Sequence, residues 1–431
     1  MSEPPCRVGT VGTPSAAEVD SAGRLLFPEG RCVEWWIGAD DRWRYPGREV
    51  AVRQHLEGNA PVVVTAMRVP GGDAVHTAYA TGSSVVIEIH NDSPTPFLAA
   101  LVLSGAGVTG NNPVTGSVGV DDTNLLVGGA VAARFAHAPS AVTTADSLDA
   151  LRADVAAGVA PGVSSEVGNH VAALVPVAHR ARVRVTVPLE AEGTPTDPRH
   201  VDDVGAVVRG WERQRSTGLR ADIPDPTVAA LTHAARCDLL LSGTMPRPAP
   251  ELVAALEDWG HDDEAMTGWA QLGFRGRGRA RRRPWNDATP EALAAELHRL
   301  TGEASPVATW SEGPAPFLLV VRAILGREAR DGSLELLAAF PPSWAGGDLD
   351  VHDLPTRSGP LSYALRWHGE NPALLWEGAD GLRLRVPGID PTWETTEPNG
   401  EALLVMGAEH PIRLWSADAQ GGDGAGGERH G

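Results

Sequence analysis

The segment 257–266, EDWGHDDEAM, holds a conspicuous group of carboxylates, and Asp258 is its candidate catalytic residue. A pair of carboxylates here would suit acid–base chemistry, and a larger set would suit a hard metal ion. The favoured interpretation is structural. Gly260 ends one helix, and the acidic residues 262–264 begin the next, where the helix dipole favours negative side chains.

Trp285, Trp310 and Glu312 lie in RPWNDATP and ATWSEGPAP, each just before a predicted helix start. Indole faces stack on pyranose rings, and a carboxylate there can act as a general acid or accept hydrogen bonds from sugar hydroxyls. The favoured alternative is that both tryptophans fill a helical core and that Asp287 or Glu312 caps a helix. If a saccharide binds, we expect it near these residues, with Trp259 as a neighbour.

The segment 35–46, WWIGADDRWRYP, gathers Trp35, Trp36, Trp43 and Tyr45 around two aspartates. Such a group could form an aromatic platform for a sugar. The favoured interpretation is a strand, a turn and a return strand whose aromatic side chains face the core. His352, His368 and Glu370 form another candidate functional group. It is also interpreted as structural, because WHGENP is typical of a hairpin turn.

The run RGRGRARRRP, spanning Arg275 to Arg283, is the one basic patch of the sequence. Contact with a nucleic acid or a phosphorylated sugar would explain it. No aromatic residue interrupts the run, and the whole chain carries a net charge of −19. A solvated loop is therefore the favoured interpretation, and nucleic-acid binding is disfavoured.

The composition of the 431 residues excludes several chemistries. All basic residues other than histidine are arginine, which rules out Schiff-base chemistry and the lysine of a P-loop. The three cysteines are isolated and the histidines lack close ligand spacing, so we expect no metal and no cofactor. No secretory signal and no apolar stretch of the ~20 residues that span a bilayer is visible. We therefore expect a soluble, cytoplasmic protein.

The period of the apolar residues changes twice along the chain. Up to about residue 200, short runs alternate with period two, as in VVIEIH (85–90), and turn residues separate them; this pattern predicts an antiparallel β-sandwich. One helix interrupts it, capped by Ser147 and ended by Gly158. Residues 202–326 change to a helical period and predict about six helices, one of them capped by Asp225. The strand period returns over 331–416, and 417–431 should be a disordered tail.

The C-terminal segment 340–377 resembles the β domain that closes six-hairpin glycosidases. The matching features are Pro342, Trp344, the Leu354–Arg357 turn, Gly359 and the hairpin at 366–368. The N-terminal segments 58–80 and 90–101 are similar to the sandwich domain of the same group. The resemblance implies a β-sandwich, a helical toroid and a small β-sandwich in that order. It names no catalytic residue.

The predicted helical block departs from that family. A full toroid needs twelve helices, at least ~190 residues at usual helix and loop lengths, and 202–326 can supply about half. The toroid is therefore truncated, or its helices adopt an open arrangement. Family catalysis uses paired carboxylates at one end of the complete barrel.

We therefore favour a glycosidase-like protein of carbohydrate metabolism that has lost catalysis and binds a saccharide or a partner protein. The alternative is an active glycoside hydrolase or phosphorylase that uses Glu312 with Asp258 or Asp287. A regulatory or nucleic-acid-binding module using the arginine run is the third hypothesis. The sequence leaves the sugar, the linkage and the oligomeric state open.

Overall fold

The protein is described from a computed structural model, which covers residues 6–105, 118–160, 162–163, 168–274, 285, 287–303, 313–369 and 371–406. Contacts divide these residues into two units. The first holds the chain up to Arg213 and the segment Leu240–Pro246, and the second holds the other described residues. Within these ranges, no helix combines the length and the apolar character needed to cross a membrane.

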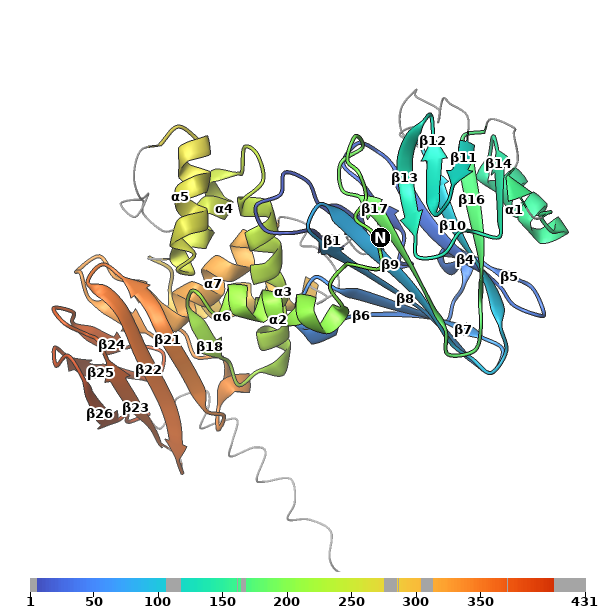
Figure 1. Cartoon of the computed structure of the whole chain (residues 1–431). Helices are drawn as coiled ribbons and strands as arrows, with labels where there is room; N and C mark the ends of the chain where they lie inside the picture. Colours follow the sequence, from blue (N-terminus) through green and yellow to red (C-terminus); the bar gives the residue numbers. More distant parts are fainter. Residues whose placement is uncertain are drawn as a thin grey trace, which may run out of the picture. The chain divides into compact units, whose positions relative to one another are not determined.

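The first unit contains two large sheets that pack face to face (Figure 1). In order, the strands of the first sheet are β1 (Cys6–Val8), β2 (Ala17–Val19), β3 (Leu25–Leu26), β4 (Cys32–Gly38), β10 (Phe97–Ser104), β16 (His170–Val177), β14 (Ala141–Ala145) and β15 (Gly162–Val163), with β5 (Trp43–Arg44) paired to β4. Those of the second sheet are β11 (Val118–Asp121), β12 (Asn124–Val127), β13 (Ala130–Phe135), β17 (Arg182–Pro188), β9 (Ser84–Asp92), β8 (Gly72–Thr81), β7 (Val63–Val69) and β6 (Val52–Leu56).

Alternating apolar side chains build the core between these sheets. Trp35 of β4 and Leu101 of β10 face inward from the first sheet and are paired in register. Ile87 and Ile89 of β9 face them from the second sheet. Strand side chains alternate between the two faces of a sheet, so this core uses every second residue. The predicted antiparallel sandwich is confirmed.

The outer face of the first sheet carries a second, smaller core under a helix. Leu151 and Val155 of α1 (Leu148–Ala157) lie one helical turn apart and pack with Trp36 and neighbouring sheet residues. The Ser147 hydroxyl accepts the N–H of Ala150 (3.2 Å), and the helix ends at a glycine. Both predicted ends of this helix are confirmed.

Six helices follow within the described part of the chain, as the sequence predicts. They are α2 (Val204–Arg215), α3 (Pro226–Gly243), α4 (Pro250–Asp258), α5 (Asp262–Gln271), α6 (Pro290–Glu303) and α7 (Ala315–Leu325). Asp225 caps α3, because its carboxylate accepts the N–H groups of Thr227 (2.9 Å) and Val228 (3.1 Å). Gly260 separates α4 from α5 with a φ of 76°, and three acids occupy the first turn of α5.

Two smaller sheets complete the second unit (Figure 1). One comprises β18 (Arg220–Asp222), β21 (Leu349–Thr356), β22 (Gly359–His368), β23 (Asn371–Glu377) and β26 (Gly400–Leu403). The other comprises β19 (Gly326–Glu328), β20 (Leu334–Leu336), β24 (Leu384–Val386) and β25 (Asp390–Thr395). Single 3₁₀ turns occur at η1 (Pro46–Arg48), η2 (Glu57–Asn59) and η3 (Pro342–Trp344).

The order of β-sandwich, helices and smaller β sheets confirms the predicted fold class. The helices beyond Arg213, apart from the short segment of α3 assigned to the first unit, belong with the C-terminal sheets. The predicted tail, 417–431, lies outside the described residues.

Candidate functional site

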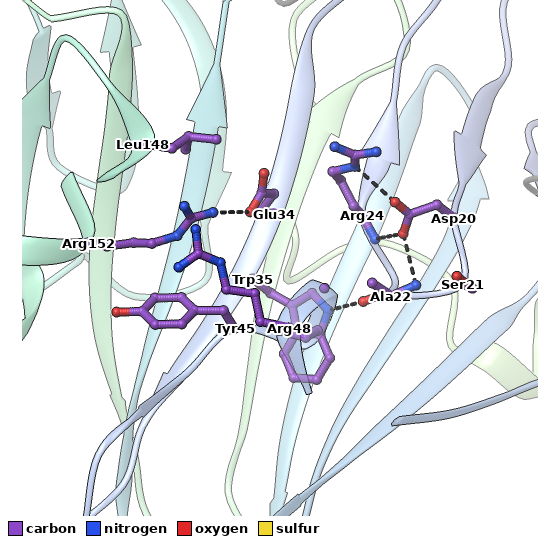
Figure 2. Close-up of a pocket in the computed structure, with 12 residues that line it drawn as sticks. Asp20, Ser21, Ala22, Arg24, Glu34, Trp35, Tyr45, Arg48, Leu148 and Arg152 are labelled. Atoms are coloured by element: carbon purple, nitrogen blue, oxygen red, sulfur yellow. Dashed lines mark hydrogen bonds and ion pairs between the residues drawn. The ribbon is translucent and has the colours of Figure 1, made fainter. Parts of the chain in front are cut away.

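A pocket of about 390 Å³ opens on the first unit beside α1 (Figure 2). A turn, strand β4, the η1 turn and the start of α1 supply its walls. The lining residues are Asp20, Ser21, Ala22, Arg24, Glu34, Trp35, Tyr45, Pro46, Gly47, Arg48, Leu148 and Arg152. The pocket therefore collects side chains from positions up to 132 residues apart (20 to 152).

The turn at 20–24 holds a carboxylate and a guanidinium in fixed positions. One oxygen of Asp20 accepts the N–H groups of Ala22 and Arg24, both at 2.9 Å. Its other oxygen accepts the Arg24 Nε–H at 2.9 Å. The Gln54 side-chain amide donates to the Asp20 carbonyl (2.8 Å) and ties the turn to the second sheet. Asp20 thus presents an oriented acceptor at the pocket wall.

Strand β4 sends consecutive side chains to opposite faces of the sheet. Trp35 enters the core, and its indole N–H donates to the Ala22 carbonyl (3.0 Å), which joins the turn to the sheet. Glu34 and Trp36 face α1, and the Trp36 indole N–H donates to Glu34 Oε2 (3.1 Å). The same oxygen lies 4.0 Å from Arg152 Nη2. Both contacts are made to one oxygen of the Glu34 carboxylate.

Two arginines converge on one aromatic ring and one carboxylate. The guanidinium carbons of Arg152 and Arg48 lie 5.3 Å and 5.9 Å from the centre of the Tyr45 ring, within the range of cation–π attraction. Both also donate to the same oxygen of Asp149, Arg152 at 2.8 Å and Arg48 at 3.1 Å. These hydrogen bonds, that of Arg152 first, lower the pKa of Asp149. The Asp149 side chain is 82% exposed.

The lining offers a small excess of positive charge and a mixture of donors and acceptors. Three guanidinium groups face two carboxylates, a net charge of +1, in a chain whose net charge is −19. Burial raises the pKa of Tyr45, so its hydroxyl stays protonated. Among the described residues that hydroxyl has no hydrogen-bond partner, and none of those lining the pocket is a histidine, cysteine or lysine. These donors and acceptors suit the binding of a polar ligand.

A serine–histidine pair lies on the same side of the sheet, outside the pocket lining. Ser104 and His170 are opposite each other on β10 and β16, and the Ser104 hydroxyl lies 2.8 Å from His170 Nδ1. Burial is the main cause that lowers the pKa of His170, with a raising influence from Glu34 and a lowering one from Arg152. Ser104 is 3% exposed, so a ligand cannot reach it as a nucleophile.

Two of the sequence-predicted residues lie inside the helical core of the second unit. Trp259 is fully buried, its indole N–H donates to the Leu318 carbonyl (3.1 Å), and the Arg236 guanidinium lies 5.1 Å from its ring centre. Asp258 is also buried, and its backbone carbonyl accepts the Arg322 Nε–H (3.0 Å). The Trp259 ring offers no face for stacking on a sugar.

Trp285 and Asp287 lie near the start of α6. The carbonyl of half-buried Trp285 accepts a hydrogen bond from Arg327 (2.8 Å), and exposed Asp287 forms an ion pair with Arg330. Trp310, Glu312 and the arginine run 275–283 lie outside the described residues. The predicted sugar site and catalytic pairs thus stay predictions.

The sequence analysis did not identify Asp20, Arg24, Glu34, Arg48 or Arg152 as site residues. The segment 35–46 did carry a signal, because Trp35 and Tyr45 both line the pocket; Trp35 and Trp36 are buried as predicted. Across the described ranges no group of three or more histidine, cysteine, aspartate or glutamate residues is placed to hold a metal ion.

Comparison with known proteins gives a limited result. No family model matches the chain, and no curated protein matches its sequence. Among solved structures, the chain is similar to a bacterial glucoamylase complexed with acarbose, with a TM-score of 0.42 and 8% sequence identity. The match covers 63% of this chain and 50% of the glucoamylase chain. At these values the likeness adds nothing to the assignment of the site.

Proposed function

We propose that the protein binds a saccharide in the pocket beside α1. The observation that carries the proposal is the lining itself, in which fixed carboxylates and guanidinium groups surround an accessible tyrosine. Sugar hydroxyls both donate and accept hydrogen bonds, so their recognition needs acceptors and donors in defined positions. Asp20 and Glu34 supply acceptors, while Arg24 and Arg152 supply donors.

The walls are fixed before any ligand arrives. Asp20 is held by three hydrogen bonds within its own turn, and Glu34 is held by the Trp36 indole. Side chains that are already ordered lose little conformational entropy on binding. The volume of about 390 Å³ lies at the lower end of the ~300–1,000 Å³ typical of small-molecule sites. This size suits a ligand of one or two sugar rings.

Binding, with catalysis lost, agrees best with this lining and with the sequence resemblance to six-hairpin glycosidases. Both carboxylates already accept hydrogen bonds from the protein, an arrangement that positions a ligand. The active alternative, with Glu312 and either Asp258 or Asp287 as its carboxylates, stays a hypothesis. A screen with chromogenic glycosides tests it, because turnover that disappears in Glu312→Gln would support that alternative.

Calorimetric titration of the full chain with a panel of mono- and disaccharides tests the proposal. We expect at least one saccharide to bind, and Tyr45→Ala to weaken that binding roughly tenfold through the loss of its ring. Val50→Ala is the matched control, because Val50 follows the same segment, is fully exposed and does not line the pocket. The proposal fails if no saccharide binds, or if Tyr45→Ala and Val50→Ala bind the best saccharide equally well.

A further inference from the structure

Two arginines of the pocket share one exposed carboxylate that lies outside the pocket lining. Arg48 Nη2 and Arg152 Nη1 donate to the same Asp149 oxygen at 3.1 Å and 2.8 Å. Arg48 and Asp149 have exposed side chains (58% and 82%), whereas the Arg152 side chain is only 16% exposed. The Arg48–Asp149 pair joins two exposed groups and contributes little to stability, so a ligand can replace Asp149 at Arg48 at little cost.

Arg152 retains hydrogen-bonding capacity for such a ligand. Its Nε–H has no hydrogen-bond partner among the described residues but is covered by protein atoms, so Nη1 and Nη2 are the donors open to a ligand. Glu34 occupies one side of the guanidinium at 4.0 Å, and the Tyr45 ring lies 5.3 Å from it (Figure 2). A guanidinium has five N–H donors, more than these partners use, and its fork geometry matches an oxyanion.

The charge of the lining points in the same direction. Arg24 forms an ion pair with Asp20 in the same turn, and Arg152 lies near Glu34. Among the lining residues, one positive charge therefore remains. The present partner of this charge is Asp149, outside the lining, so a ligand that replaces Asp149 must be anionic to keep the charge paired. We propose that the saccharide bound here carries an oxyanion, which Arg48 and Arg152 bind in the place taken by the Asp149 carboxylate. This inference rests on the proposed function and deepens it.

Four ligands built on one scaffold test the inference by calorimetric titration of the full chain at low ionic strength. They are glucose, glucuronate, glucose 6-phosphate and glucose 6-sulfate, and inorganic phosphate is titrated alone as a fifth arm. We expect at least one acidic sugar to bind about tenfold or more tightly than glucose, because charge-assisted hydrogen bonds to guanidinium are added. The three acidic sugars distinguish a carboxylate from a phosphate or a sulfate.

Asp149→Asn is the decisive variant, because it should strengthen binding of the acidic sugar at least threefold. Asp154→Asn is its control: Asp154 is exposed on the same helix, does not line the pocket and changes the net charge equally. Arg48→Gln should weaken the acidic sugar about tenfold and glucose less than twofold, whereas Arg152→Gln should weaken both ligands and the acidic sugar more strongly. Thermal melts establish that these variants fold.

The outcomes separate the two proposals. Glucose binding as tightly as every acidic sugar, or Asp149→Asn behaving like Asp154→Asn, overturns the oxyanion site and leaves saccharide binding standing. Phosphate binding that Asp149→Asn strengthens, without binding of any sugar, supports the oxyanion site and overturns the saccharide function. Binding of neither phosphate nor any sugar overturns both.

Discussion

Arg152 shows how one residue type can serve both the fold and the site. Its guanidinium lies over the Trp36 ring, which belongs to the core under α1, and over the Tyr45 ring, which lines the pocket. Nothing in the sequence distinguishes this arginine from the others, because its role depends on strands that lie far away along the chain.

Gly23 is the residue that lets the pocket turn lie against the sheet. Its φ is +78°, and a Cβ atom there would lie 2.9 Å from both Thr65 Oγ1 and Trp35 Nε1. We expect Gly23→Ala to lower the free energy of unfolding by about 2–4 kcal/mol, from left-handed backbone strain and from the close contact. Urea unfolding measures the loss.

Gly12 provides the control for this prediction. Its φ is +81°, and nothing lies within 4 Å of a Cβ at that position. Gly12→Ala therefore carries the backbone strain alone and should cost about 1–2 kcal/mol. Equal losses for the two variants would show that the close approach of the turn to Trp35 is unimportant.

Burial of His76 should make the stability of the first unit depend on pH. It stacks on Trp35 with ring centres 5.1 Å apart, and burial lowers its pKa to about 3. Between this value and the unfolded pKa of about 6.5, the unfolded chain binds one more proton than the folded chain. The contribution of His76 to stability is therefore fully present above pH 6.5 and falls by about 1.4 kcal/mol for each pH unit below it, down to about pH 3.

Urea unfolding at pH 7 and pH 5 measures this loss in the wild type and in His76→Gln. The variant should lose less stability than the wild type over this interval, by about 2 kcal/mol. His55→Gln is the control, because the His55 side chain is 61% exposed. If His76→Gln and His55→Gln have the same pH dependence, buried His76 does not control the acid response.

Among the elements, α1 carries both Arg152 and one of its partners, Asp149. Leu151 anchors the helix and is fully buried on the outer face of the first sheet. Leu151→Ala should destabilise the first unit by about 2–5 kcal/mol and weaken ligand binding, because Arg152 is the next residue. Asp154→Ala, on the exposed side of α1, should change neither quantity. Urea unfolding measures the stability, and titration calorimetry measures the affinity. An unchanged affinity in Leu151→Ala would show that the packing of α1 does not position the binding site.

The helices and their ends were predictable because their signals are local. Ser147 and Asp225 are oxygen-bearing side chains placed two or three residues before the amides that they cap, so the sequence itself displays them. The alternation of apolar residues in 85–90 likewise predicted a strand with every second side chain facing the core. The order of strands in the sheets was not predictable, because β4 pairs with β10 across about sixty residues.

Across the whole molecule, the described residues of the site predicted from the sequence and the residues that line the pocket lie in different units. In the second unit, the tryptophan–carboxylate pattern led to Trp259 and Asp258, which the fold buries. In the first unit, the pocket forms where residues 20–24, 34, 45–48 and 148–152 meet. Such a site has no local spacing to detect, because sheet register and the packing of α1 create it.

A crystal structure of the full chain with the tightest-binding saccharide would show directly whether the pocket beside α1 is the binding site. We expect electron density for the sugar between Tyr45, Arg152 and Asp20. When the sugar is acidic, we also expect Asp149 to have moved away from Arg48 and Arg152. Density for the sugar beside Trp285 or Trp310, with an empty pocket beside α1, would show that the saccharide binds at the helices instead.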